Sequence, residues 1–425
     1  MQSLDLNKFP GVELPRFIKI KQHFNRQKVE DIPGEVRKKM EPYLGNLTGK
    51  RIAVGVGSRG VANIALVTKT VVDTLKEAGA KPFIIPVMGS HGGATPEGQA
   101  ELLASFGISE SAMGVPVDAS IDVETIGEFE PGSPIYVCKS ALEADGIVII
   151  PRIKPHTCFR GPIESGICKM LVIGLGKRLG ADSVHSRGFD RFAELIPKIG
   201  CIIAQKTKVL FAVALVENAY EDTYKIEIVP KDDILLLERE AALLEEARSL
   251  MGRIMFPKFD ILVIDEIGKN ISGDGQDPNV TGLYITKCVS GGPEFKKSII
   301  LDVTEESHGN ANGVGMVDVT TRKLFDKIDY ISMYTNAYTS TEVEAVKIPM
   351  VAATSEDALR MAVKMCNGIG TGQHKIVWIQ NTLELTTMLI SEPLLAEAEA
   401  NSNIEVISDP KPLSFVEGEP QKNLI

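Results

Sequence analysis

Residues 149–191 combine basic side chains, carboxylates and two of the chain's six histidines. Imidazoles exchange protons near neutral pH and cationic side chains hold carboxylates or phosphates, so this stretch could bind and transform a small anion. The apolar run Gly146–Ile150 stops at Pro151, which is typical of a buried strand that runs into a loop. Because strand ends converge in a crevice of an α/β sheet, we expect these side chains and His91 to share one site. The side chains in this stretch are Lys154, His156, Arg160, Glu164, Lys169, His185 and Arg187.

A glycine-rich loop at residues 55–60 fits the pattern G-x-G-x-x-G between a predicted strand and a predicted helix. The start of that helix could hold a phosphate. A dinucleotide site also requires an acid at the end of the second strand, where this chain has residues 87–91, VMGSH. We therefore predict a bound phosphate or carboxylate rather than NAD, with a tight turn that binds nothing as the alternative. The residues that would make this site are Gly57, Ser58, Arg59 and Gly60.

His91 follows the second predicted strand on a loop of glycines. Thr95 then caps a predicted helix, with Pro96 at the first helical position. A lone histidine is more often structural, but an exposed loop at the end of a strand favours a functional role.

The elements that would position these loops alternate between strands and helices. The predicted strands are 51–56, 81–87, 146–150, 210–217 and 224–229, and the predicted helices are 62–78, 96–106, 190–206 and 232–248. This order predicts an α/β fold with mostly parallel sheets and helices on their faces. We expect an N-terminal α/β domain, residues 1–253, and a C-terminal α/β domain, residues 254–425, with the active site in the cleft between them.

The C-terminal domain offers fewer candidates. A strand predicted at 259–268 runs into a long polar loop, residues 269–282, which carries Lys269 and Gln276. Lys269 could pair with a substrate carboxylate, although a turn-rich surface loop is the alternative. Trp378, the single tryptophan, either packs in the core or lines the site.

Composition argues against several partners. A net charge of -10, with no cluster of Lys and Arg, argues against nucleic acid and anionic membranes. No apolar run approaches the ~18 residues of a membrane span and the first residues are not a signal peptide, so we expect a cytoplasmic protein. The six cysteines form no C-x-x-C pair, which disfavours zinc-ribbon and iron–sulfur sites. We interpret Cys158 and Cys168 as small packed residues, with a ligand or nucleophile role as the alternative.

These residues resemble the nickel-dependent lactate racemase family and its hydroxyacid racemase and epimerase relatives. The similarity covers most of residues 50–230. It rests on Ser58-Arg59, on Gly89-Ser-His91 with Thr95 and Glu97, on Lys154-Pro-His156, and on Lys169 followed by His185.

The resemblance implies a nickel-pincer nucleotide, a pyridinium bisthiocarboxylic acid mononucleotide that carries nickel. It implies that this cofactor is tethered through a thioamide to Lys169 and that His185 is the protein ligand of the nickel. It implies that His91 and His156 are the catalytic acid/bases and that Arg59 lies near the substrate or the cofactor phosphate. The enzymes that make the cofactor are then expected partners.

The implied reaction inverts the C2 centre of a 2-hydroxy acid, which could be lactate-like or a sugar acid. The C2–H bond is weakly acidic, so the hydrogen would leave as hydride and return to the other face of a planar 2-keto acid. Histidines with an unperturbed pKa of ~6.5 suit the hydroxyl proton, and Arg59 or Lys269 could hold the carboxylate. Gln276 and Trp378 are the further candidate substrate contacts. Soft sulfur donors with an imidazole suit nickel.

Two other functions fit the same scaffold. One is a nickel-independent acid/base isomerase or lyase of a sugar acid, and the other is a non-catalytic protein that binds a phosphorylated or carboxylated metabolite. In each case the partner is a small molecule, and the chain could form a homo-oligomer.

Overall fold

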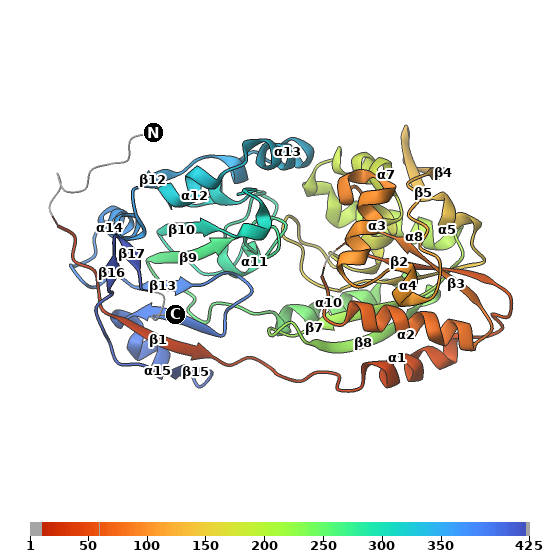
Figure 1. The fold of residues 1–425 in the computed structure, drawn as a ribbon, viewed down its shortest axis with the longest axis horizontal. Coiled ribbons are helices and arrows are strands. Elements are labelled where there is room, and N and C mark those ends of the chain that lie inside the picture. Colours follow the sequence, from red (N-terminus) through yellow and green to blue (C-terminus); the bar gives the residue numbers. More distant parts are fainter. Residues whose placement is uncertain (1–10, 59, 422–425) are drawn as a thin grey trace. The chain divides into compact units, whose positions relative to one another are not determined.

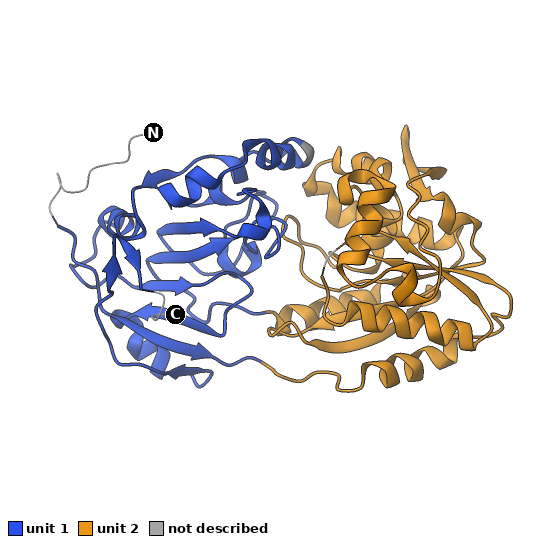
Figure 2. Ribbon diagram, in the orientation of Figure 1, with its two compact units in different colours: residues 1–24, 252–425 blue, residues 25–251 orange. Residues whose placement is uncertain are grey.

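The computed structural model describes residues 11–58 and 60–421 and divides the chain into two compact units (Figure 2). Unit 1 comprises residues 1–24 and 252–425, and unit 2 comprises residues 25–251. Both units are mixed α/β and each is built on a large sheet with many parallel strands, as the strand–helix order predicted (Figure 1).

The sheet of unit 2 has the strand order β3–β2–β6–β7–β8. Four of its strands run parallel and β8 is an antiparallel edge. β6 is buried along its whole length, which is typical of a parallel strand covered on both faces. The strands are β2 (Arg51–Val56), β3 (Lys81–Pro86), β6 (Gly146–Ile150), β7 (Val209–Glu217) and β8 (Thr223–Pro230), which confirms the predicted strands.

The strand order of this sheet reverses beside β2. The chain passes from β2 to β3 on one side and later returns to β6 on the other side. Val56 pairs with Ile150 at the carboxyl ends of β2 and β6, so the loops after these strands leave the sheet next to each other. Such a reversal is where ligands usually bind in an open α/β sheet.

Helices cover both faces of this sheet. The predicted helix 232–248 is divided in two, because Leu237 adopts a left-handed conformation with a φ of 65°. Thr95 caps α3 as predicted, since its Oγ1 accepts the backbone N–H of Gly98 at 3.1 Å. The helices and the remaining hairpin are α1 (Ile32–Met40), α2 (Ile64–Glu77), α3 (Pro96–Ser105), α4 (Glu110–Met113), β4 (Val123–Glu130), β5 (Ser133–Cys138), α5 (Lys139–Glu143), α8 (Phe192–Lys206), α9 (Lys231–Leu236) and α10 (Glu238–Leu250).

The segment after the β6 loop is helical but irregular. α6 (Ile167–Lys169) continues into a π-helical turn, Met170–Gly174, and α7 (Lys177–His185) follows. The backbone N–H of Leu175 donates to the carbonyl of Met170 at 3.0 Å, the five-residue step of a π-helix. A turn at residues 175–176 separates the π-helical turn from α7.

The sheet of unit 1 has the order β12–β11–β10–β9–β13–β14–β1–β15. β9 to β13 run parallel, and β14, β1 and β15 extend the sheet antiparallel. The strands are β9 (Ile261–Ile267), β10 (Lys297–Val303), β11 (Val319–Thr321), β12 (Met350–Ala352), β13 (Ile376–Ile379), β14 (Thr387–Ser391), β1 (Phe17–Gln22) and β15 (Ile404–Val406). The helices are α11 (Pro278–Thr281), α12 (Arg322–Lys327), α13 (Tyr330–Ser340), α14 (Ser355–Met365) and α15 (Leu395–Glu399), and β16 (Phe415–Val416) pairs with β17 (Glu419–Pro420). Within the part of the chain that the structure describes, no helix has the length and apolar character needed to span a membrane.

The unit to which β1 belongs differs from the predicted domain division, which placed residues 1–253 in the N-terminal domain and 254–425 in the C-terminal one. The strand pairs with β14 and β15, through Phe17 with Ser391 and Ile20 with Val406, so it belongs to unit 1. Its apolar side chains become buried in that sheet, which explains why residues 17–22 belong to unit 1 although the segment that follows belongs to unit 2. The second crossing lies between Met251 and Gly252.

Candidate active site

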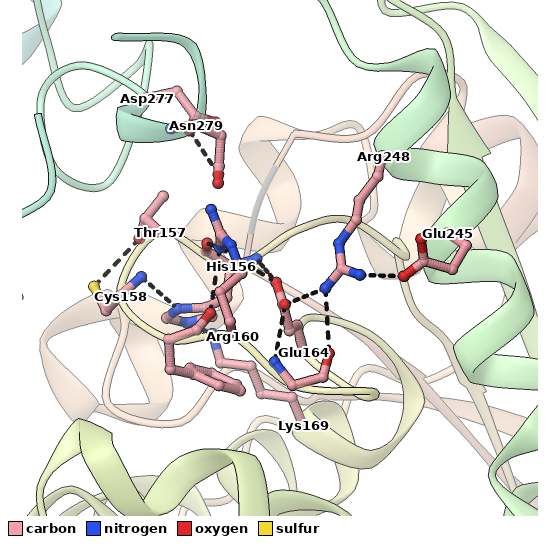
Figure 3. Close-up of polar contacts among 12 residues, drawn as sticks. His156, Thr157, Cys158, Arg160, Glu164, Lys169, Glu245, Arg248, Asp277 and Asn279 are labelled. Carbon is pink, nitrogen blue, oxygen red and sulfur yellow. Dashed lines mark hydrogen bonds and ion pairs between the residues drawn. The ribbon is translucent and has the colours of Figure 1, made fainter. Parts of the chain in front are cut away.

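Three of the residues predicted to do chemistry lie together in unit 2. Lys169 Nζ is 2.6 Å from His156 Nε2 (Figure 3). The charge of Lys169 also acts on His185, so all three side chains share one electrostatic environment. They come from the loop after β6, from the end of α6 and from the end of α7.

A buried carboxylate, Glu164, organises the loop that carries His156. Its Oε2 accepts the backbone N–H of His156 at 2.6 Å and its Oε1 accepts that of Gly161 at 3.1 Å. Arg248 of α10 donates to the same carboxylate and Arg160 lies 3.5 Å from it, so its charge is balanced (Figure 3). The side chain of Glu164 is fully buried, so its carboxylate makes the hydrogen bonds to these backbone groups that water would make on an exposed loop.

The tautomer of His156 follows from its hydrogen bonds. The backbone N–H of Cys158 donates to His156 Nδ1 at 3.0 Å, so this nitrogen has to be an acceptor. The proton of the neutral ring therefore lies on Nε2, which faces Lys169. Burial, with the charges of Lys169 and Lys154 in second place, holds the pKa of His156 well below its usual range. His156 is thus a neutral imidazole at physiological pH.

Lys169 is positioned through α6. The buried carboxylate of Glu240 accepts the backbone N–H of Cys168 at 3.2 Å and so caps this helix. The close approach requires a glycine, because a Cβ at Gly166 would lie 2.5 Å from Glu240 Oε1. Burial raises the pKa of Glu240 to about 7.

The cysteines around the site are buried. Cys168 packs against Gly200 of α8, where a Cβ would lie 2.9 Å from its sulfur. Burial, reinforced by Glu240, raises the pKa of the Cys168 thiol well above its usual range. A protonated, buried thiol is a poor nucleophile, which agrees with the interpretation of Cys158 and Cys168 as packed residues.

His185 offers a ring nitrogen as a ligand or acceptor. Its Nδ1 donates to the carbonyl of Ala181 at 2.7 Å, so Nε2 carries the lone pair. Burial lowers the pKa of His185, which keeps this lone pair available near neutral pH. Phe189 and Phe192 pack edge-on against the ring at 5.7 and 5.1 Å, and Phe189 also lies 6.3 Å from His156. These aromatic rings were not predicted as part of the site.

His91 lies on the loop after β3 and contacts the loop after β2 through a hydrogen bond between its Nδ1 and Ser58 Oγ. Gln99 of α3 donates to the carbonyls of Gly89 and His91 at 2.9 and 3.2 Å, which fixes the course of this loop. The backbone N–H of Gly89 reaches the carbonyl of Gly174 at 3.4 Å. The His91 loop therefore packs on the segment that joins Lys169 to His185.

A buried lysine, Lys177, supports the His91 loop through Gln99 and through the end of β3. Lys177 is 1% exposed, and its Nζ donates to Gln99 Oε1 at 3.0 Å and to the carbonyl of Pro86 at 2.6 Å. Its φ of 53° is unusual for a residue with a side chain. Neither Lys177 nor Glu240 was predicted, because no sequence pattern distinguishes a buried charged residue from one on the surface.

The glycine-rich loop after β2 adjoins the same region. A Cβ at Gly57 would lie 3.9 Å from the end of the Met170 side chain, whereas Gly60 is exposed. Arg59 lies outside the described residues. The backbone N–H of Ala62, just before α2, donates to Glu217 Oε1 at 2.6 Å, so a protein carboxylate already uses one donor at this helix start. Anion binding by this loop stays a prediction.

Two of the predicted substrate contacts in unit 1 are buried. Trp378 is 1% exposed, donates from Nε1 to Asp265 Oδ1 at 2.7 Å and packs edge-on against Phe17. Gln276 is fully buried, and its amide donates to the carbonyl of Leu283 at 3.1 Å. The structure thus assigns both side chains to the interior of unit 1 rather than to a substrate surface.

Lys269 lies on the loop after β9 and is half-buried. Its Nζ donates to the carbonyl of Gly273 within the same loop, and its backbone N–H donates to Ser307 Oγ at 2.9 Å. The first contact closes the loop on itself, and the second joins it to the segment after β10. A substrate contact by Lys269, and the predicted cleft between the two domains, stay predictions.

No three His, Cys, Asp or Glu side chains among residues 11–58 and 60–421 are grouped so that they could hold a metal ion. A metal at this site would therefore need donors that the described residues do not supply.

Comparison with known structures gives a similarity that extends over most of the chain. Over 86% of this chain and 99% of the other, the structure superimposes on the lactate racemase apoprotein from Thermoanaerobacterium thermosaccharolyticum, with a TM-score of 0.53 and 17% sequence identity. The two proteins share a fold. A sequence family described as "Domain of unknown function (DUF362)" matches residues 57–267.

Other comparisons add little. A dipicolinate synthase component from Bacillus halodurans covers 47% of this chain and 93% of its own length, at 16% identity and a TM-score of 0.20. That score is too low to indicate a common fold. No curated protein matches the chain.

Proposed function

We propose that the protein is an isomerase, a racemase or epimerase that inverts the C2 centre of a 2-hydroxy acid. The observation that supports this best is the cluster of Lys169, His156 and His185 in unit 2. The fold shared with a lactate racemase apoprotein points the same way.

The residues present fit a tethered nickel-pincer nucleotide. Lys169 offers an amine for the tether, and His185 offers the lone pair of Nε2 to the metal. Because the described residues form no metal-binding group of three, the remaining donors have to come with the cofactor, and sulfur donors with an imidazole suit nickel. When bound, this cofactor supplies an electrophilic centre that exchanges hydride with C2.

The chain's own residues would handle the hydroxyl proton. His156 is neutral and buried, as a base requires, but its Nε2 carries a proton that points at Lys169. For Nε2 to accept a substrate proton, the ring proton would have to move to Nδ1, and the contact between Nδ1 and the Cys158 N–H would have to open. His91, hydrogen-bonded to Ser58, would serve the opposite enantiomer.

Positive charge beside the imidazoles suits a carboxylate substrate. Lys154 and Arg160 both lie close enough to His156 to lower its pKa. Arg160 also donates to the carbonyl of His156 at 2.5 Å, so its guanidinium is held near the ring. We propose Arg59 and Lys269 as further cations for the same carboxylate.

A panel of single enantiomers of 2-hydroxy acids and sugar acids, separated by chiral chromatography after incubation, tests this function. The chain has to be produced together with a pathway that makes the cofactor. We expect inversion of at least one acid, with a loss of about 10²-fold or more in His91→Ala and in His156→Ala. His23→Ala, which removes an exposed histidine of unit 1, is the matched control and should retain turnover. Full turnover in both His91→Ala and His156→Ala would contradict the two-base assignment.

A nickel-independent isomerase or lyase of a sugar acid is the second candidate. The neutral imidazole of His156 beside the Lys169 amine favours it, since this pair can do acid/base chemistry with no metal. It predicts turnover by chain produced without the cofactor pathway, which separates it from the first proposal.

A further inference from the structure

We propose that an exposed tyrosine face on α13 of unit 1 is the surface through which two copies of this chain form a dimer. The tyrosine face comprises Tyr330, Ile331, Tyr334 and Tyr338. The proposal uses no residue of the candidate active site, so it is independent of the racemase function.

α13 packs on unit 1 along one side only (Figure 1). Met333 is fully buried, Ala337 is 5% exposed, and Asn310 donates from its side chain to Asn336 Oδ1 at 3.0 Å. At 3.6 residues per turn, the four side chains of the tyrosine face lie within one sector about 100° wide, beside this buried side. Two of them are almost completely exposed, Ile331 at 81% and Tyr338 at 88%. The helix therefore presents a continuous apolar and aromatic stripe.

The area of the tyrosine face is enough for a weak dimer. Its side chains are 37%, 81%, 49% and 88% exposed, which corresponds to roughly 500 Å² if full exposure is about 200 Å² for each. Exposed patches of this size on soluble proteins usually mark a contact. Two such faces would bury about 1,000 Å² in total, the lower limit for a specific interface. We therefore expect a dissociation constant in the micromolar range.

The absence of charge favours a second copy as the partner. None of residues 330–340 is charged, although 24% of the whole chain is. Each chain carries a net charge of -10, so two copies repel each other and can meet most easily through a neutral surface. A strongly charged partner would find no residue to pair with on this helix. A helix that binds a membrane surface would carry Lys or Arg beside its apolar residues.

The spacing of the tyrosines suits a two-fold axis. In a symmetric dimer the same patch is used twice, so that residue i meets residue j and j meets i. Tyr330, Tyr334 and Tyr338 follow one another at intervals of four residues. An antiparallel pair of helices would therefore set Tyr334 against the partner's Tyr334 at the axis and Tyr330 against the partner's Tyr338. Tyrosine rings pair well edge-on, as Tyr330 and Tyr334 already do within the chain at 5.5 Å.

Sedimentation velocity of the full chain from about 1 to 100 µM tests the dimer, and a micromolar affinity should show as a monomer that gives way to a dimer. Tyr334→Glu would place two like charges face to face and should weaken the dimer at least about 100-fold. Leu236→Glu is the matched control, because it alters an exposed leucine of unit 2, and it should dimerise like the wild type. Circular dichroism checks that both variants are folded. A wild-type chain that stays monomeric throughout, or an unchanged dimer in Tyr334→Glu, would overturn the proposal.

Oxidative cross-linking tests the axis itself. Tyr334→Cys should form a disulfide-linked dimer when it is oxidised with copper phenanthroline, because each new thiol faces its own copy. The wild type, in which Cys288 is exposed, gives the background, and Leu236→Cys should not exceed it. Linked dimer at the background level in Tyr334→Cys would contradict the two-fold contact. A monomeric chain that captures a cofactor-making enzyme through α13 would assign the tyrosine face to that partner and overturn the proposal.

Discussion

Glu240→Gln should change how the stability of unit 2 depends on pH. Glu240 is 1% exposed, and its carboxylate caps α6 directly beside Lys169. Burial raises the pKa of Glu240 from 4.5 to about 7 in the folded chain. A glutamine keeps the shape and the acceptor oxygen but cannot ionise.

The magnitude follows from the two pKa values. Below pH 4.5 Glu240 is protonated in both the folded and the unfolded chain, so it adds no pH dependence. As the pH rises from 4.5 to about 7 the unfolded chain ionises first, which favours unfolding, and above about 7 the loss is complete. At about 1.4 kcal/mol per pH unit, the free energy of unfolding of the wild type should fall by about 3 kcal/mol relative to Glu240→Gln.

Urea unfolding followed by far-ultraviolet circular dichroism between pH 4.5 and 8 measures this difference. Amide hydrogen exchange in peptides of α6 and α8 assigns it to unit 2. Glu245→Gln, on the same helix with its side chain 70% exposed, is the matched control and should follow the wild type at every pH. Parallel stability curves for the wild type and Glu240→Gln would refute the assignment of Glu240 as a carboxyl group that burial keeps protonated.

Three further changes test the positioning of the site. Arg248→Met should destabilise unit 2 by about 3 kcal/mol because the buried carboxylate of Glu164 loses the arginine that donates to it and keeps only the more distant Arg160, and a double-mutant cycle with Glu164→Gln should recover part of that loss. Lys177→Met should speed hydrogen exchange in the loop of residues 87–95 and cost about 1–3 kcal/mol, whereas unchanged exchange would remove its supporting role. Trp378→Phe should cost about 1–3 kcal/mol in unit 1 and leave substrate turnover unchanged, and a loss of turnover without a loss of stability would restore it as a substrate contact.

Periodicity was enough to predict most of the scaffold. The strands before the Gly57 and Pro151 loops are continuous apolar runs bounded by glycine or proline, and such runs are strong signals of buried parallel strands. The strand β1 was missed although its alternation of apolar and polar residues was available, because its partners β14 and β15 lie more than 350 residues away. The interruption at Leu237 has no sequence signal, since leucine is a good helix former.

The site was predictable only in part. His156, Lys169 and His185 were identified by residue type and by their place after a strand, and the structure brings them together. Glu164 was named in the same stretch without a role, and Glu240 was not identified, because burial of a charged side chain depends on tertiary contacts far along the chain. For the same reason the sequence could not show that Gln276 and Trp378 are buried, with their polar groups hydrogen-bonded inside unit 1.

Intact mass and nickel content of chain co-produced with a cofactor-making pathway test the proposed function most directly. We expect an added mass of one nucleotide cofactor and about one nickel per chain, as a single imidazole with sulfur donors would bind. Lys169→Ala should lose the added mass, whereas His185→Ala should keep the mass and lose the nickel. An unmodified mass without nickel in the folded wild-type chain would contradict the assignment of Lys169 as the tether and His185 as the metal ligand.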